Sequence, residues 1–198
     1  MLLYDSAVSG NCYKVRLLLA QLGIDYERRE VDVVDRSDRK ELLGSLNPRL
    51  RVPTLVFDDG RALGESGAIL WYLANGTTFV PADPWERAKV LQWTFFEQYS
   101  HEPNIAVARF WLHSLGAAPS EETLAEKQRL GYLALDALEG GLIGQEFLVG
   151  ERYSIADIAL YAYTHVADEG GFDLEHYPAI GSWLGRVSAQ PGHVPIDA

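Results

Sequence analysis

The sequence has a single cysteine, Cys12, so no disulfide can form within the chain, and we expect a reducing, cytoplasmic environment. It also lacks long apolar runs: none approaches the roughly 18 uncharged residues that a membrane span requires. The first ten residues have no basic region ahead of their apolar positions, so we expect no secretory signal.

Basic residues are few. The chain has 17 Lys and Arg against 28 Asp and Glu, a formal net charge of −11, and it contains no dense Lys/Arg cluster. Because phosphates are bound by such clusters, nucleic acid is excluded as an expected partner. The acidic excess is uneven: residues 1–80 hold 10 basic and 11 acidic side chains, whereas the remainder holds 7 and 17. This difference indicates two units with different surfaces.

The first 80 residues alternate between strand and helix patterns. A hairpin is indicated where two apolar runs flank Asp59-Gly60. Gly23 follows a run with helical spacing and is a candidate C-terminal cap. The expected segments are strand 1–7, helix 12–23, strand 25–34, a polar and partly helical connection 35–48, hairpin 52–63 and helix 65–76. This βαβαββα order predicts a compact α/β domain over residues 1–78.

The remainder reads as helical. We expect helices at 84–115, 120–139, 154–168 and 178–189, separated by Gly- and Pro-containing breaks. These helices predict an all-α domain over residues 84–198, joined to the first domain by a Pro-punctuated linker near Thr77 to Pro84. Ser154 and Asp157 have capping-box spacing, which indicates a folding role.

Two short motifs near the hairpin indicate a binding site. Pro53 belongs at a strand start, and a cis Val52-Pro53 bond would turn the main chain of Val52 outward to pair with an extended peptide. Ser66 is an expected N-cap of the next helix, whose dipole favours an anion, and the Glu65 carboxylate suits an ammonium. Together they suit an α-amino acid head; the alternative is that Ser66 only caps and Glu65 is only solvated.

Val52-Pro53-Thr54-Leu55 followed by Glu65-Ser66-Gly67-Ala68-Ile69 resembles the glutathione-site motif of cytosolic glutathione transferases. The resemblance extends over essentially the whole chain. It implies a thioredoxin-like domain followed by a helical domain, and glutathione as co-substrate. It also implies that Val52 pairs with the cysteinyl part of glutathione, that Pro53 is cis, and that Glu65 and Ser66 hold the γ-glutamyl end.

The resemblance extends to the thiol end. Glutathione reacts as a thiolate, and a hydroxyl or amide donor at a helix N-terminus stabilises that anion. Ser9 stands where serine-using classes place their donor serine, and Asn11 stands where the nu-like bacterial class has asparagine. Ser9 is the first choice and Asn11 the second. Tyr4 is a weaker candidate, and Cys12 is either a reactive thiol, as in the omega and beta classes, or a buried packing residue.

Several basic residues are candidates for binding the glycyl carboxylate. Arg51 directly precedes Val52 and is the first choice; Arg36, Arg39 and Lys40 are others. Related sequences often carry a small residue where this chain has Leu50. Taken alone, each of these cations is more consistent with a solvated surface charge.

In the helical half, residues 93–111 are rich in aromatic and charged side chains. One helix face would carry both Glu102 and Arg109, and the alternative is an aromatic core with a buried ion pair. The resemblance implies that this region borders the electrophile pocket and a dimer interface, with Phe110, Trp111 and His113 as candidate pocket residues. The five histidines show no metal-ligand spacing, and no metal site is predicted.

These observations lead to a homodimeric glutathione transferase that adds glutathione thiolate to a small hydrophobic electrophile, in detoxification. The first alternative is a nu-like, glutathione-dependent disulfide reductase or peroxidase. The second is a glutathione-binding module without catalysis. The identity of the electrophile does not follow from the residues.

Overall fold

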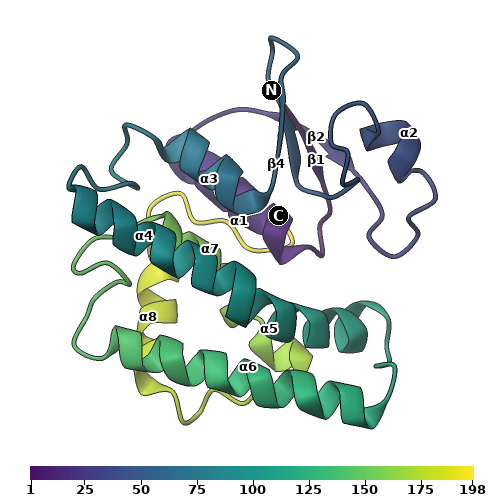
Figure 1. Cartoon of the computed structure of the whole chain (residues 1–198). Helices are drawn as coiled ribbons and strands as arrows, with labels where there is room; N and C mark the ends of the chain where they lie inside the picture. The colour runs from purple at the N-terminus through teal and green to yellow at the C-terminus, as the bar shows by residue number, and fades with distance from the viewer. The chain divides into compact units, whose positions relative to one another are not determined.

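The computed structural model describes all 198 residues, which form two compact units. Unit 1 comprises Met1–Asn75 together with Pro191–Ala198, and unit 2 comprises Gly76–Gln190. Unit 1 contains β1 (Leu2–Asp5), α1 (Gly10–Leu22), β2 (Glu27–Glu30), α2 (Arg39–Leu43), β3 (Thr54–Val56), β4 (Ala62–Gly64) and α3 (Ser66–Ala74), shown in Figure 1. The expected βαβαββα order is confirmed.

The sheet of unit 1 is mixed, with strand order β2-β1-β3-β4. β1 pairs with β2 in parallel, placing Tyr4 opposite Arg29, and with β3 antiparallel, placing Tyr4 opposite Thr54. β3 and β4 form the expected hairpin around Asp59-Gly60. Side chains of successive strand residues point to opposite faces, so each face of this sheet has its own core.

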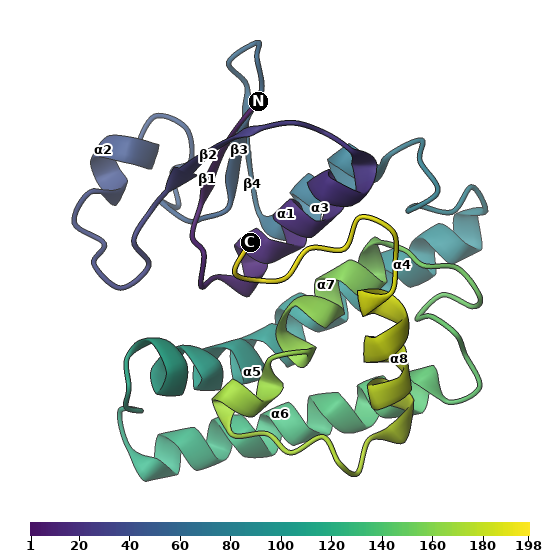
Figure 2. The same ribbon diagram turned by 180° about the vertical axis from the view of Figure 1, so that it is seen from behind.

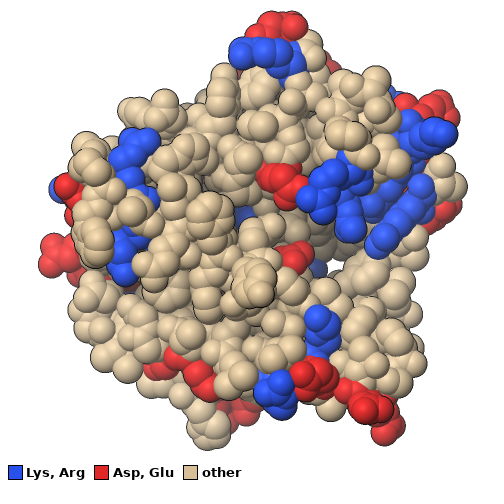
Figure 3. Space-filling view, in the orientation of Figure 1, with Lys and Arg blue, Asp and Glu red and all other residues tan.

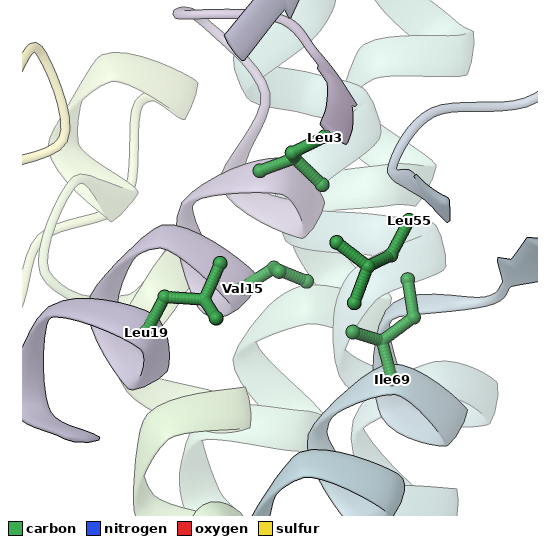
Figure 4. Close-up of a cluster of buried hydrophobic side chains, with 5 residues drawn as sticks. All are labelled: Leu3, Val15, Leu19, Leu55 and Ile69. Carbon is green, nitrogen blue, oxygen red and sulfur yellow. The ribbon is translucent and has the colours of Figure 1, made fainter. Parts of the chain in front are cut away.

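One face of the sheet packs on α1 and α3. Leu3 and Leu55 come from the strands, Val15 and Leu19 from α1, and Ile69 from α3, and all five are fully buried (Figure 4). Their burial explains why α1 and α3 lie side by side (Figures 1 and 2). This contact brings the N-terminal ends of two helices close to each other.

The opposite face packs on α2 and the segment that follows it. Tyr4, the strand neighbour of Leu3, lies there with Val31 and Leu43, and Val52 is among the partly buried residues around them. The alternation along β1 therefore separates Leu3 from Tyr4, as a strand with both faces covered requires.

The last eight residues belong to unit 1, although we expected them in the helical domain. The hydroxyl of Tyr13 on α1 donates a hydrogen bond to the main-chain oxygen of Val194 at 2.7 Å. Gly192, at φ +73°, lies where a Cβ would come within 3.0 Å of the Gln21 Cα. Figure 2 shows this segment running alongside α1. These contacts are between residues far apart in the sequence, which explains why helix periodicity gave no sign of them.

Unit 2 is helical. Its elements are α4 (Pro84–Phe96), η1 (Glu97–His101), α5 (Glu102–Arg109), η2 (Phe110–Ser114), α6 (Glu121–Leu142), α7 (Ile155–Thr164), η3 (Ala167–Gly170) and α8 (Pro178–Ser188). α5 packs on α6, α4 on α7, and α6 on α8 (Figure 1). The two-part fold class predicted from the sequence is confirmed. No helix has the length and apolar content that crossing a membrane would require.

The expected long helix at 84–115 contains two π-helical turns, η1 and η2. Pro103 lies in the first turn of α5, directly after η1. Because proline has no N–H and its ring clashes with a preceding carbonyl, a widened turn accommodates it without ending the helix. The long helix thus continues through Pro103, with a π-helical turn just before it.

The capping box that opens α7 is present, with Asp157 fully buried in it. Its carboxylate accepts hydrogen bonds from the Ser154 main-chain N–H (2.9 Å), the Leu148 N–H (3.0 Å) and the Trp183 indole N–H (2.9 Å). Burial raises the pKa of Asp157 to about 6, against the opposing effect of these donors. Asp157 therefore joins three separate segments of unit 2.

This raised pKa predicts a pH dependence of stability. In the unfolded chain an aspartate has a pKa of about 3.9, so between pH about 4 and 6 the folded state binds more protons than the unfolded state. The free energy of unfolding contributed by Asp157 should fall as pH rises through that window and then level off. Urea unfolding across this range should show that slope in the wild type and not in Asp157→Asn.

The exposed Glu151 of the same unit provides the control, since Glu151→Gln removes a carboxylate that is not buried. We expect Glu151→Gln to keep the wild-type slope. A slope unchanged by Asp157→Asn would contradict the raised pKa. Asp157→Asn itself should lower the free energy of unfolding by about 1–3 kcal/mol, because an amide cannot accept all three hydrogen bonds.

Candidate functional site

The N-terminus of α1 carries the two residues expected at the thiol end. Ser9 is the N-cap, with extended backbone (φ −84°, ψ 117°), and its hydroxyl oxygen accepts a hydrogen bond from the Cys12 N–H at 3.3 Å. Its own N–H donates to the Ser6 carbonyl at 3.0 Å. The Ser9 hydroxyl proton is not used in the cap, so this group can donate to an anion placed at the helix N-terminus.

Asn11 lies in the first turn of α1 and connects two helices. Its Oδ1 accepts a hydrogen bond from the Lys14 ammonium at 2.7 Å and another from the Ser66 hydroxyl at 3.2 Å. Ser66 is the first residue of α3 and is buried. The structure therefore brings together Asn11, a thiol-end candidate, and Ser66, a γ-glutamyl-end candidate, which are 55 residues apart in the sequence.

Lys14 is a candidate site residue that the sequence reasoning missed. Its side chain is 1% exposed, and burying an ammonium is costly unless it is hydrogen-bonded. A lysine has only donors, so Asn11 must present its oxygen to Lys14 and turn its amide NH₂ the other way. The available signal was a lysine within the mostly apolar run Cys12–Leu19, in which Arg16 is the other charged residue.

Glu65, not Ser66, is the N-cap of α3. It has φ 66°, in the left-handed region that residues other than glycine rarely adopt, and it makes no side-chain capping bond. The expected Ser66 cap is therefore wrong, because Ser66 lies in the first turn with its hydroxyl directed to Asn11. The exposed Glu65 carboxylate lies 3.3 Å from the Arg49 guanidinium. Its backbone geometry holds this carboxylate at the start of α3.

Val52-Pro53 is a cis peptide bond, as expected. The main chain of Val52 makes no hydrogen bond to another residue of the chain, although β3 begins two residues later. The preceding residue is held firmly: the Arg51 carbonyl accepts from the Asn47 amide (3.2 Å) and the Thr54 hydroxyl (2.8 Å). The result is an ordered backbone edge able to pair with an extended peptide.

The four candidate cations divide into two kinds. Arg39 is buried and donates to the carbonyls of Leu50 (3.2 Å) and Asp32 (3.4 Å), so it supports the loop. Burial, together with neighbouring Arg36 and Arg51, lowers the pKa of Arg39. Leu50 has φ 54°, which accounts for the small residue common in related sequences. The exposed cations are Arg36, Lys40 and Arg51.

These exposed cations form the basic part of an otherwise acidic protein. Figure 3 shows Lys and Arg side chains gathered over the part of unit 1 that carries α2. Like charges held near one another create a positive potential that favours an anion such as a carboxylate. Arg51 is the member of this group that adjoins Val52 in the sequence.

The two other thiol-end candidates lie elsewhere. Tyr4 faces the α2 side of the sheet, packed with Val31 and Leu43. Cys12 is fully buried on α1. Burial, followed by the nearby Asp5 charge, raises the pKa of the Cys12 thiol, so it remains protonated at neutral pH. The packing interpretation of Cys12 fits this environment, and the reactive interpretation does not.

In unit 2 the three candidate pocket residues share one π-helical turn. Phe110, Trp111 and His113 all belong to η2, and the His113 ring lies 3.3 Å from Glu169. Arg109 is buried and pairs at 2.6 Å with the same Glu169, which lies on η3. A cavity of about 410 Å³ elsewhere in unit 2 is lined by Trp85, Trp93 and neighbours, and by none of these three. No group of acidic, His or Cys side chains has the arrangement of a metal site.

A thioredoxin-like unit that contains a cis-proline, followed by a helical unit, defines a class of two-domain proteins. The chain matches the glutathione S-transferase N-terminal domain over residues 8–75 and the C-terminal domain over residues 91–191. The chain belongs to the glutathione S-transferase family. The expected family, enzyme type and glutathione as co-substrate are thereby confirmed.

Similar proteins include both transferases and an oxidoreductase. A crystal structure of glutathione S-transferase from Pseudomonas fluorescens is 51% identical, with a TM-score of 0.95 and 98% of each chain covered. The disulfide-bond oxidoreductase YfcG of Escherichia coli is 32% identical over 93% of this chain and 89% of its own length. Glutathione S-transferase D7 of Drosophila melanogaster is 25% identical over 92% and 81%.

The environment of Cys12 predicts low reactivity. In the native protein, alkylation by iodoacetamide at neutral pH should be at least about a hundredfold slower than in the urea-unfolded chain, because the thiol is buried and protonated. Mass spectrometry of the modified protein measures this directly. Rapid native alkylation, together with activity lost at the same rate, would restore Cys12 as a reactive thiol.

Proposed function

We propose that this chain conjugates glutathione thiolate to small hydrophobic electrophiles, with the site built on the N-termini of α1 and α3. The observation that carries the proposal is the hydrogen bond from Ser66 to Asn11. It joins the helix end suited to a thiolate to the helix end suited to an α-amino acid head, beside the open main chain of Val52. Glutathione carries both groups on one extended peptide.

At the thiol end, Ser9 and Asn11 donate to the sulfur. The Ser9 hydroxyl and the Asn11 amide NH₂ both lie at the positive end of the α1 dipole. The buried Lys14 ammonium adds a positive charge one hydrogen bond away. All three favour the thiolate over the thiol, which lowers the pKa of bound glutathione.

At the peptide end, the Val52 main chain pairs with the cysteinyl residue, next to cis-Pro53. The Glu65 carboxylate binds the γ-glutamyl ammonium, while Ser66 and the first-turn N–H groups of α3 bind its carboxylate. Arg51 binds the glycyl carboxylate. Each charged group of the tripeptide thus receives a partner of opposite sign.

The reaction is a nucleophilic displacement or addition. The thiol proton passes to solvent, the sulfur forms a bond to an electrophilic carbon, and in displacement the leaving group departs with the bonding electron pair. Phe110 and Trp111 supply apolar surface for the electrophile, and His113 a polar edge. Removal of hydrophobic electrophiles in the cytoplasm is the biological role that this chemistry suits.

We further propose that the protein works as a homodimer. Phe95 on α4 and Tyr99 on η1 are 66% and 87% exposed, although aromatic side chains of this size are usually buried. They lie one helical turn apart, so they form one apolar stripe on this helix. A second copy of the chain would cover it.

A second function is favoured by the similarity to the disulfide-bond oxidoreductase. In that reaction two glutathione thiols become one disulfide while a substrate disulfide becomes two thiols, so no cysteine of the protein is required. The inert environment of Cys12 is compatible with this scheme. Conjugation of an aryl halide, compared with reduction of a glutathione-capped disulfide or an organic hydroperoxide, separates the two functions.

Ultraviolet titration of bound glutathione tests the activation of sulfur. The wild type should ionise the thiol well below its free pKa of about 8.5. Ser9→Ala should raise the bound pKa by about one unit or more, because a donor to the thiolate is lost. A larger effect of Asn11→Ala would favour the redox function, and no early ionisation in the wild type would indicate a binding module.

Lys14 offers a separate test. Lys14→Met keeps the length of the side chain and removes both the charge and the bond that orients the Asn11 amide. We expect a higher pKa of bound glutathione and kcat about tenfold lower or more, with the KM for glutathione changed less. A change in KM alone would contradict a role at the sulfur.

A further inference from the structure

The loop between β1 and α1, Ser6–Ser9, is held by side chains from outside it. The Ser6 carbonyl accepts from the Ser9 N–H and also from the Arg16 guanidinium at 3.2 Å. The Ala7 carbonyl accepts from Arg16 at 3.2 Å, and the Ala7 N–H donates to the Glu30 carboxylate at 2.9 Å. The main chain that leads into Ser9 is therefore fixed by hydrogen bonds on consecutive residues.

Arg16 is the centre of this arrangement. Its side chain is 2% exposed and pairs with the fully buried Asp5 at 2.7 Å. One guanidinium nitrogen donates both to the Ala7 carbonyl of the loop, at 3.2 Å, and to the main-chain oxygen of Ile196, at 2.5 Å. Because a buried guanidinium is costly when its donors lack acceptors, the position of Ile196 bears directly on the hydrogen bonds that Arg16 makes to the loop.

Arg28 makes a second connection between Asp5, the residues that hold the loop, and the segment Pro191–Ala198. It pairs with Asp5 and lies 3.5 Å from Glu30, the carboxylate that holds the Ala7 N–H. It also donates to the main-chain oxygen of Ala198 at 2.8 Å. We call Arg16 and Arg28 the arginine pair. Arg16 bonds to the loop carbonyls, and Arg28 bonds to Asp5 and Glu30, which flank the loop and hold it. Both arginines also bond to main-chain oxygens of the segment Pro191–Ala198.

We propose that the segment Pro191–Ala198 completes the thiol-activating site of unit 1 by acting through the arginine pair. Arg16 is a positioning residue: it touches no substrate, and it holds the Ser6 and Ala7 carbonyls so that Ser9 caps α1 with its hydroxyl directed to the sulfur. The acceptors at Ile196 and Ala198 keep the arginine pair in place. This proposal rests on the proposed function, in which Ser9 donates to glutathione.

The arrangement explains an otherwise costly feature of the fold. Two cations, Arg16 and Arg28, and the buried Asp5 carboxylate support the loop. An ordinary turn between a strand and a helix does not need so many charged groups to hold it. The main-chain oxygens of Ile196 and Ala198, which lie 180 residues after Arg16 and 170 residues after Arg28, complete the set of acceptors. A hydrogen-bond donor that stabilises an anion benefits from such preorganisation, because the donor then needs little rearrangement, and little free energy for it, when the anion forms.

Gly192→Val is the variant that displaces the segment without touching the loop. A side chain at residue 192 meets the main chain of α1 at Gln21 and Ala20, at 3.0 and 3.2 Å, and the positive φ resists it as well. Gly144→Val is the matched control: Gly144 has the same φ of +73°, has open space around it and lies in unit 2. Backbone strain is common to both variants, and the steric clash with α1 is not.

A third variant, Arg16→Lys, keeps the positive charge and loses the forked geometry of the guanidinium. Three measurements apply to Gly192→Val, Gly144→Val and Arg16→Lys. They are the pKa of bound glutathione, kcat and KM for glutathione, and hydrogen exchange of the Ser9 and Cys12 amides. For Gly192→Val and Arg16→Lys we expect the bound thiol pKa to rise by about one unit and kcat to fall about tenfold. KM should change less, exchange at both amides should accelerate, and Gly144→Val should resemble the wild type.

A merely structural role would lower the melting temperature and leave the thiol pKa and amide exchange of the folded protein unchanged; that result overturns the proposal. If the wild type fails to lower the pKa of bound glutathione, the proposed function fails instead. Amide exchange then still decides: faster exchange at Ser9 and Cys12 in Gly192→Val, but not in Gly144→Val, retains the coupling of segment to loop. Equal exchange in both variants rejects it.

Discussion

The buried ion pair between Asp5 and Arg16 is the interaction on which unit 1 depends. It connects the end of β1 to the middle of α1, and removing one partner of such a pair typically costs about 3–5 kcal/mol. The pair fixes the path of the loop that ends at Ser9, and so it fixes where α1 begins. A site that needs a helix N-terminus next to a strand end is built on that geometry.

The polar cluster around Asn11 follows from the same packing. The apolar faces of α1 and α3 cover one side of the sheet (Figure 4), and this brings Asn11 within hydrogen-bond distance of Ser66. The buried Lys14 then determines which end of the Asn11 amide faces outward. Core packing, charge burial and the orientation of a candidate sulfur donor are thus successive consequences of one arrangement.

Much of this was predictable from sequence, and the failures share a cause. Local signals identified the βαβαββα order, Gly23 as a cap and the Ser154–Asp157 box, because each depends on neighbouring residues. Helical spacing placed Arg109 and Glu102 on one helix face, but it could not show that Arg109 pairs with Glu169, 60 residues away. Periodicity describes a face of one helix and says nothing of which element covers it.

By itself, the sequence determined the order of elements, the cis-proline motif and the residue types that suit glutathione, since these follow from backbone preferences and side-chain chemistry along the chain. The tertiary structure decided that Glu65 and not Ser66 caps α3, and that Cys12 is buried. It also joined Lys14 to Asn11 and placed residues 191–198 against α1. Each of these depends on which distant groups compete for a hydrogen bond or exclude water, and only the folded arrangement sets that competition.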